Sequence, residues 1–236
     1  MDFSTVAKLS RFKDIVTTLL KYGLDEAVQR LNFPGAKLIK RIYTVEQEMG
    51  IYERIRCVLE DLGPTFVKFG QIMSLRPDLL PSDLLFELSK LQDEVPPVEI
   101  SEIRPVVEKG LGQSIENVFS TFDNESIAAA SISQVHRAVL KKGGSIVVAK
   151  VQRPGIRKKI QADLDILESV ARRLHENSDD LKPYDLPNLV SAVRRNLIRE
   201  IDFRIEAQNL RIARAFASET DVHIPEVYNE YCSEQM

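Results

Sequence analysis

Tryptophan is absent from the 236 residues, and aromatic residues together make up only 7% of the chain. A folded core must therefore consist mainly of Leu, Ile, Val and Ala side chains. The two cysteines, Cys57 and Cys232, are too few and too far apart for a disulfide framework or a cysteine-based zinc site, and they fit a reducing compartment. The three histidines, His136, His175 and His223, are scattered, which argues against a histidine-rich metal site.

Long apolar runs are also missing. No run approaches the ~20 residues that a membrane-spanning helix needs, and the N-terminal residues lack the apolar core of a secretory signal. The formal net charge of −3 argues against a general nucleic-acid-binding protein, although residues 126–162 carry eight Lys or Arg and no acid. The hydrophobic fraction of 44% and the charged fraction of 28% are those of an ordinary globular chain. We therefore expect a cytoplasmic protein of one large or two small domains.

The pattern of apolar residues changes near residue 115. Before it, apolar residues recur at helical spacing, broken at Gly63-Pro64 and Pro96-Pro97, and Thr44 has Gln47 three residues on, as in a helix capping box. After it, segments 118–122, 128–140 and 145–151 are rich in Val, Ile, Ala and Ser, which is typical of short strands.

Helical spacing returns further along the chain. It predicts one helix over 156–175 and one long helix over 186–218, and residues 223–228 read as a further strand. This order predicts an α+β fold with a small antiparallel sheet. We expect two domains, a helical region over 1–115 and a mixed region over 116–236.

One predicted strand, Val147 to Val151, contains a single lysine, Lys150, among apolar neighbours. In a strand, Lys150 shares a face with Val148. Such a lysine either binds an anionic group, for instance the phosphates of a nucleotide, or extends into water from an edge strand. Both interpretations are open at this point.

A run of small residues lies ahead of the lysine strand, between two strand candidates. It consists of Ala128, Ala129, Ala130, Ser131, Ile132, Ser133, Gln134, Val135 and His136. Small residues let backbone N–H groups approach a phosphate, and alanine makes such a loop stiffer than glycine would. The alternative is a small-residue turn packed against the sheet.

Three acids lie close together in the last helical pattern, namely Glu200, Asp202 and Glu206. On one continuous helix Asp202 and Glu206 share a face, while Glu200 lies about 200° away from Asp202. Two carboxylates on one stripe can serve a lysine or a Mg²⁺ ion. The alternative is a solvated helix face on which Arg199 and Arg204 are local partners.

Two polar residues lie in the short helix predicted after Gly63-Pro64. Lys68 and Gln71 are three residues apart, so we expect their side chains to meet. Gly70 between them would let another backbone approach closely. The alternative is a joint between helices with exposed polar ends.

Together and in this order, these segments resemble the UbiB/AarF (ABC1/ADCK) family of atypical protein-kinase-like proteins. The resemblance covers about residues 10–230. The matching segments are Lys68-Phe69-Gly70-Gln71 for the K-x-G-Q motif, 128–136 for the alanine-rich loop, 148–155 for the strand lysine and its turn, Glu200-Ile201-Asp202 for the E-x-D motif, and Glu206 for the helix-C glutamate.

The resemblance implies a protein-kinase-like N-lobe that contains the alanine-rich loop, the strand lysine and helix C, preceded by a helical extension that carries the K-x-G-Q motif. Lys150 would contact the α- and β-phosphates of ATP or ADP and pair with Glu206 as catalytic residues. The loop residues 128–135 would cover the phosphates and alter nucleotide preference. The basic stretch from Arg137 to Lys159 would add positive potential for a polyphosphate, or would be a solvated hairpin.

The resemblance also implies a regulatory contact. Lys68 and Gln71 would lie on the extension, folded over the site, and would meet Glu200 and Asp202 there. The intact protein would then be an atypical kinase or ATPase that supports the biosynthesis of ubiquinone or another isoprenoid quinone. An alternative is a non-catalytic regulator that binds a partner protein or an anionic membrane surface through the basic residues 1–45. A further alternative is an unrelated α+β fold with fortuitous motifs.

The family's catalytic-loop Asp and Asn and its metal-binding Asp-Phe-Gly are not found in residues 221–236. We therefore expect an N-lobe without its C-lobe, Mg²⁺ ligands outside these residues, and no useful catalytic rate from this chain alone. The lobe face left exposed predicts a dimer. Peripheral attachment at the inner membrane and binding to quinone-biosynthesis proteins are open alternatives for its location and partners, and nucleic acid is not expected as a partner.

Overall fold

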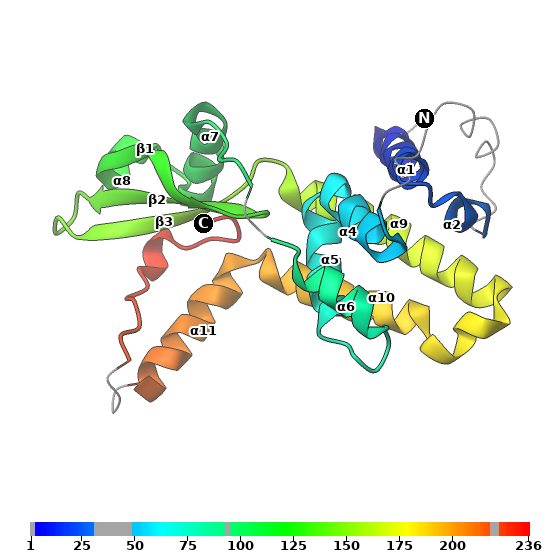
Figure 1. The fold of residues 1–236 in the computed structure, drawn as a ribbon. Coiled ribbons are helices and arrows are strands. Elements are labelled where there is room, and N and C mark those ends of the chain that lie inside the picture. Colours follow the sequence, from blue (N-terminus) through cyan, green and yellow to red (C-terminus); the bar gives the residue numbers. More distant parts are fainter. Residues whose placement is uncertain (1–2, 31–48, 93–94, 218–221) are drawn as a thin grey trace. The chain divides into compact units, whose positions relative to one another are not determined.

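The computed structural model describes residues 3–30, 49–92, 95–217 and 222–236. The chain forms two compact units, one from Met1–Asp93 and Lys158–Arg195 and the other from Glu94–Arg157 and Asn196–Met236. We call them the helical unit and the sheet unit. Both are drawn in Figure 1, and each is described by itself.

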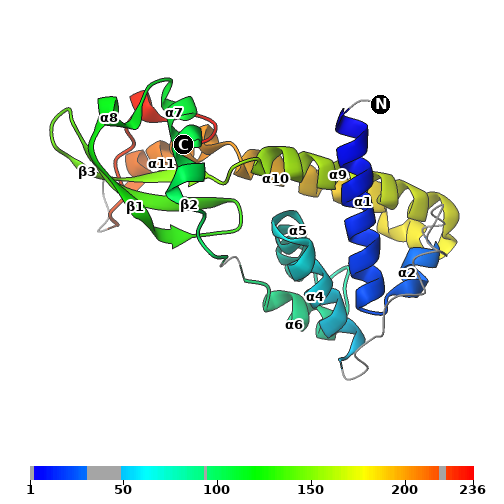
Figure 2. The same cartoon turned by 90° about the horizontal axis from the view of Figure 1, so that it is seen from above.

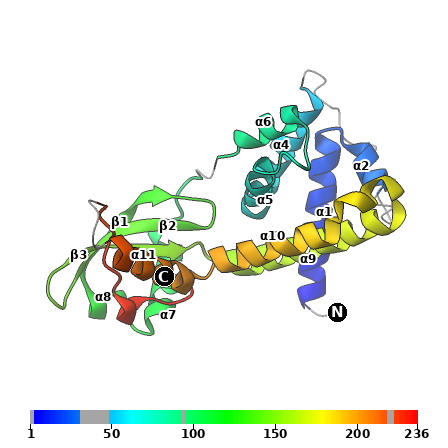
Figure 3. The ribbon, with the colours of Figure 1, turned by 90° about the horizontal axis from the view of Figure 1, so that it is seen from below.

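The helical unit is built almost entirely from α-helices. Its elements are α1 (Phe3–Lys21), α2 (Asp25–Arg30), α4 (Ile51–Leu62), α5 (Pro64–Ser74), α6 (Ser82–Ser89), most of α9 (Ile156–Asn177), the 3-10 helix η1 (Asp179–Tyr184) and the first part of α10 (Leu186–Glu200). Figure 2 shows α1 running across α9, and Figure 3 shows α9 beside α10. Arg194 of α10 donates a hydrogen bond of 2.6 Å to Asp165 of α9.

The apolar core of this unit joins α1, α4, α5 and α9. Its buried members are Ile15, Val58, Leu62, Phe66 and Ile166. The break predicted between α4 and α5 is confirmed, because Gly63 has a φ of 90°, which favours glycine, and Pro64 opens α5. The predicted capping box at Thr44 lies outside the described residues.

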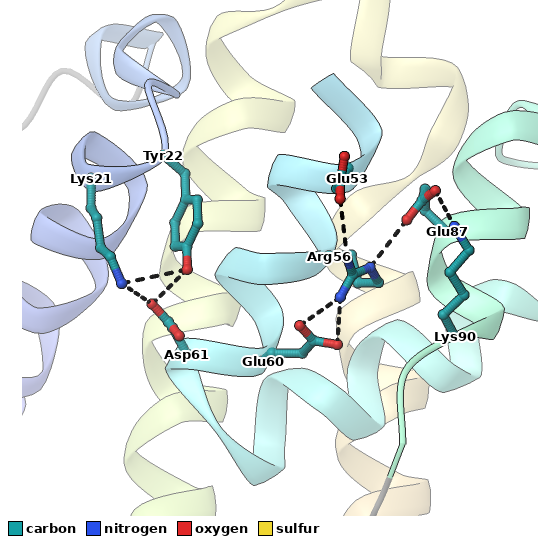
Figure 4. A network of polar contacts seen from close by, with 8 residues as sticks. All are labelled: Lys21, Tyr22, Glu53, Arg56, Glu60, Asp61, Glu87 and Lys90. Atoms are coloured by element: carbon teal, nitrogen blue, oxygen red, sulfur yellow. Dashed lines mark hydrogen bonds and ion pairs between the residues drawn. The ribbon is translucent and has the colours of Figure 1, made fainter. Parts of the chain in front are cut away.

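Ion pairs join the outer surfaces of α1, α4 and α6 (Figure 4). The Arg56 guanidinium of α4 lies 2.7 Å from Glu60 and 3.1 Å from Glu87 of α6. In a second group of contacts, Asp61 of α4 lies 2.7 Å from Lys21 of α1. Partly exposed pairs of this kind contribute about 0–1 kcal/mol each, so the buried apolar core remains the main source of stability.

The sheet unit contains a three-stranded antiparallel sheet in the order β1-β2-β3. Its elements are α7 (Ile100–Leu111), α8 (Ile115–Val118), β1 (Phe119–Ala129), β2 (Ser133–Leu140), β3 (Ile146–Gln152), the end of α10, α11 (Phe203–Phe216) and the 3-10 helix η3 (Asn229–Tyr231). Figure 1 shows α7 and α11 on opposite faces of the sheet. The predicted α+β fold with a small antiparallel sheet is confirmed.

The two faces of the sheet differ in burial because successive strand residues point to opposite sides. On the face toward α7, the buried side chains are Ile103, Val107, Ala138, Leu140, Ala149 and Val151. On the other face of β3, Ile146 is 66% exposed and Val148 is 62% exposed. One face is therefore core, and the other is open to a ligand or to further chain.

Two predicted elements are wrong. The helix predicted over 186–218 is two helices, because Asp202 has an extended backbone (φ −106°, ψ 95°) and its side chain accepts a hydrogen bond from the Arg204 N–H at the start of α11. An N-terminal cap of this kind competes with helix continuation. Residues 223–228 are not a strand. The prediction rested on the residues in this segment that favour strands. Pro225 among them has no N–H to donate to a neighbouring strand, and this outweighed their preference.

The predicted division into a helical region over 1–115 and a mixed region over 116–236 stays a prediction. The compact units divide after Asp93 instead, because α7 and α8 share their apolar core with the sheet. The segment that connects them, around Pro96-Pro97, has no regular secondary structure, in agreement with the predicted linker.

Candidate functional site

A cavity of about 650 Å³ lies between the open face of the sheet, α11 and the C-terminal segment, all within the sheet unit. This volume is in the range of small-molecule binding pockets. Apolar side chains form most of its wall, among them Val135 of β2, Val148 of β3 and Phe203 of α11. Lys150 and Glu206 also line it.

Lys150 and Glu206 form an ion pair inside this cavity. The Lys150 ammonium donates to both carboxylate oxygens of Glu206, at 2.8 and 2.6 Å, and it lies 5.0 Å from the centre of the Phe203 ring. The two side chains are 39% and 44% exposed. The structure thus brings together the lysine and glutamate whose pairing the sequence predicted, and it leaves them accessible to a ligand.

The geometry of β3 and α11 explains this meeting. In the strand, Lys150 lies opposite Val135 of β2 and on the same face as Val148. In the helix, Phe203, Glu206 and Leu210 line the cavity at helical spacing. Val148 and Phe203 were not among the site residues predicted from the sequence. Val148 lies two residues before Lys150 in a strand, and Phe203 lies three residues before Glu206 in a helix. This spacing, which places each on the same face as its charged neighbour, could have identified them.

The alanine-rich run extends over the end of β1 and the turn into β2. Ala128 pairs with Val135 and Ala129 with Gln134 in the β1–β2 ladder. Ala130 to Ile132 form the turn, and the Ala130 N–H donates to the Ser133 carbonyl at 2.8 Å. Of the run, Val135 lines the cavity. A role of Ala128 to Val135 in nucleotide binding stays a prediction.

The Gln134 side chain lies on the opposite face from Val135 and is only 1% exposed. Its Oε1 accepts a hydrogen bond from the Val98 N–H at 2.9 Å, and its Nε2 donates to the Val98 carbonyl at 3.1 Å. Nε2 also lies 2.8 Å from Nε2 of the buried His136. A direct nucleotide contact by the predicted residue Gln134 would therefore have to come from its backbone.

Asp202 of the E-x-D motif does not form the predicted stripe with Glu206. Asp202 lies outside the helix and accepts hydrogen bonds from Arg204, at 2.9 and 2.7 Å. These bonds hold the pKa of the Asp202 carboxyl below its ordinary value. Glu200 is the exposed last residue of α10. The predicted shared face of Asp202 and Glu206 is wrong because the helix is interrupted, and Arg204 is the local partner of Asp202.

Lys68 and Gln71 both lie on α5 of the helical unit and are half-buried. The Gln71 Nε2 donates to the Leu91 carbonyl at 3.1 Å. Their regulatory meeting with Glu200 and Asp202 stays a prediction.

Gly70 has a different role from the predicted one. A Cβ atom at this position would lie 2.8 Å from Cδ1 of Leu59 and closer still to Cδ1 of Leu91. The close neighbours are therefore leucine side chains and not another backbone. The missing side chain of Gly70 leaves room for the packing of α4 and the segment after α6 onto α5.

Gly70→Ala is expected to lower the free energy of unfolding by about 1–3 kcal/mol, because the added methyl overpacks this contact. Urea denaturation measures the change. Gly50→Ala is the matched control, since a Cβ there would meet no described atom within 4 Å. Equal stabilities of the two variants would contradict the overpacking.

The described residues do not form a metal site. No group of three or more His, Cys, Asp or Glu side chains among them is placed to hold a metal ion. Of the carboxylates that line the cavity, Glu206 is already bound to Lys150. Within the same part of the chain, no helix combines the length and the apolar character needed to cross a bilayer.

Residues 90–236 match the ABC1 atypical kinase-like domain. The chain belongs to this family. Of its ABC1 relatives, the probable protein kinase UbiB of Cellvibrio japonicus is 45% identical over 225 residues, which are 94% of this chain and 40% of that protein. The probable protein kinase UbiB of Vibrio cholerae is 36% identical over 234 residues, 97% of this chain and 43% of that protein. The chain thus spans less than half the length of these curated relatives.

A solved structure is also similar. The complex of Rv3197 with erythromycin from Mycobacterium tuberculosis aligns with a TM-score of 0.49 and 28% sequence identity, over 75% of this chain and 44% of that one. The family predicted from the K-x-G-Q motif, the alanine-rich loop, the strand lysine and the E-x-D motif is confirmed by the ABC1 match and the UbiB relatives.

Proposed function

We propose that the chain binds ATP or ADP in the cavity between the sheet and α11, as the nucleotide-binding part of a UbiB-like atypical kinase or ATPase. The observation that supports this most directly is the Lys150–Glu206 pair in an otherwise largely apolar cavity. A nucleotide combines a flat, weakly polar base with an anionic tail. An apolar wall that carries a lysine matches both parts.

Val135 and Val148 would pack against the base. They lie on the same sheet face as Lys150, in neighbouring strands, and both line the cavity. Val148 is 62% exposed, so a bound base would remove a substantial apolar surface from water. Arg137, which also lines the cavity, would add positive potential for the anionic tail.

Glu206 would aim the Lys150 ammonium. An ammonium group has three donors, and the two carboxylate oxygens of Glu206 accept two of them. The third donor is then available to a phosphate oxygen. Glu206 thus restricts the lysine to an orientation in which one charge-assisted hydrogen bond to the phosphates costs little ordering.

We further propose that this chain alone does not transfer phosphoryl groups at a useful rate. Phosphoryl transfer depends on metal ions and acids that stabilise the developing charge, and the described residues provide no such cluster. As the UbiB name of its relatives suggests, the protein would act in isoprenoid quinone biosynthesis. An ATPase assay of the chain should therefore give no turnover above the rate without protein.

Calorimetric titration of the protein with ATP, ADP and tripolyphosphate tests the nucleotide site. Val148→Ala should weaken ATP binding about tenfold, because two methyl groups of base contact are lost, and leave tripolyphosphate binding unchanged. Val222→Ala is the matched control, since Val222 is also 62% exposed but does not line the cavity. The proposal fails if the protein binds neither nucleotide, or if Val148→Ala binds ATP as tightly as the control.

A further inference from the structure

The turn of the alanine-rich run, Ala130 to Ile132, is held by a residue that directly follows β3. The Arg153 N–H donates to the Ile132 carbonyl at 3.0 Å. The Arg153 side chain donates from Nε to the Ala130 carbonyl at 2.8 Å. One residue thus binds both ends of the turn, once through its backbone and once through its guanidinium.

The same guanidinium reaches the segment that connects the two units along the chain. Its Nη2 donates to the Pro96 carbonyl at 2.8 Å. On the α7 face of the sheet, the Gln134 amide makes two hydrogen bonds with the backbone of Val98. Arg153 and Gln134 therefore attach residues 95–98 to the alanine-rich turn and to β2.

The half-buried Arg153 guanidinium binds carbonyl oxygens and no carboxylate among the described residues. Within the described residues it makes no ion pair, and its hydrogen bonds go to backbone oxygens of Val95, Pro96 and Ala130. Burial lowers the pKa of the Arg153 guanidinium below its ordinary value. Its charge, directly behind the turn, is therefore not neutralised by an acid in this part of the molecule.

The turn does not hold this conformation through its own side chains. Ser131 is 2% exposed, and its Oγ has no hydrogen-bonding partner among the described residues. An unpaired buried hydroxyl destabilises the conformation in which it is buried. The hydrogen bonds from Arg153 offset this cost, so the conformation of the turn depends on a residue more than twenty positions later in the sequence.

We propose that Arg153 is a positioning residue for the alanine-rich turn, which it holds in the conformation that receives the nucleotide phosphates. This inference rests on the proposed nucleotide site and on the predicted contact of the alanine-rich run, of which Val135 lines the cavity, with the phosphates. Because Arg153 lies three residues after Lys150, its hydrogen bonds also set the turn relative to the strand that carries the phosphate-binding lysine. The positive charge of its guanidinium adds positive potential next to the turn.

Two variants separate the geometry of Arg153 from its charge. Arg153→Lys keeps the charge and loses the planar set of donors, and Arg153→Gln loses the charge and keeps a donor. Arg157→Lys is the control, because Arg157 lies four residues further along the chain, in α9, and pairs with Glu234 at 3.1 Å. Amide hydrogen exchange without nucleotide, and calorimetry with ATP and with adenosine, are the measurements.

Both Arg153 variants should raise exchange of the Ala130 amide about tenfold or more and leave exchange in α11 as it is in the control. ATP affinity should fall about tenfold in Arg153→Lys, which loses about one positioning hydrogen bond, and further in Arg153→Gln, which also loses the charge, while adenosine affinity stays unchanged in both. A fold defect alone would weaken both ligands equally.

Unchanged exchange at Ala130 in both variants would overturn the inference, and so would equal losses of ATP and adenosine affinity. If Arg153→Gln does not fold, Arg153→Lys decides the question by the same measurements. Failure of the proposed function is recognised separately, since the unsubstituted protein would then not bind ATP. The exchange of the Ala130 amide still shows in that case whether Arg153 positions the turn.

Discussion

Lys150→Ala is expected to weaken ATP binding about 100-fold. The change removes a charge-assisted hydrogen bond to the phosphates, worth about 1.5–3 kcal/mol. It also leaves the Glu206 carboxylate, which lies 2.6 Å from the Lys150 ammonium in the structure, unpaired in the cavity and repelling the same phosphates. Calorimetry with ATP and ADP at fixed ionic strength measures both contributions together.

Lys142→Ala is the matched control for Lys150. Lys142 lies in the β2–β3 hairpin, its side chain is 84% exposed, and its nearest acid, Glu230, is 3.8 Å away. Its removal should change ATP affinity less than about twofold, because an exposed charge at this distance is well screened. The ATP affinity of Glu206→Gln should lie between those of Lys150→Ala and Lys142→Ala, since Lys150 keeps its charge but loses its fixed orientation. Similar affinities of Lys150→Ala and Lys142→Ala would show that Lys150 does not bind the phosphates.

Asp163→Ala is expected to lower the free energy of unfolding by about 3–5 kcal/mol, the cost of breaking a buried ion pair. Asp163 of α9 is fully buried and accepts hydrogen bonds of 2.6 Å from Arg11 of α1 and 2.6 Å from Thr65 of α5. Arg11 also donates to the Leu62 carbonyl at the end of α4. One carboxylate thus joins three helices, and its loss leaves the Arg11 charge without a partner.

Urea denaturation of Asp163→Ala measures this loss against Asp61→Ala. Asp61 pairs with Lys21 at 2.7 Å, but its side chain is 39% exposed, so its removal should cost less than about 1 kcal/mol. The double variant Arg11→Met with Asp163→Leu should be more stable than Asp163→Ala, because it removes both charges. A double variant less stable than Asp163→Ala would show that the unpaired arginine is not the cause.

Local patterns predicted the elements that depend on neighbours in sequence. The α4–α5 break at Gly63-Pro64 and the lysine strand are both recognisable within a few residues, because turn chemistry and hydrophobic periodicity act at that range. The interruption at Asp202 also has a local signal, because Asp is a common N-terminal capping residue of helices. Apolar residues at helical spacing on both sides nevertheless predicted one continuous helix. The predicted strand over 223–228 failed because β-propensity does not supply a pairing partner.

The sequence by itself determined the family, the α+β class and the identity of the lysine and glutamate that meet in the cavity. Only the tertiary structure decided that Asp202 pairs with Arg204, that Gln134 binds Val98, that Gly70 makes room for leucines and that Arg153 holds the alanine-rich turn. The physical reason is range. Periodicity and turn residues report each residue's own backbone, whereas the partner of a buried polar group or the space beside a glycine is set by segments that folding brings together from distant positions.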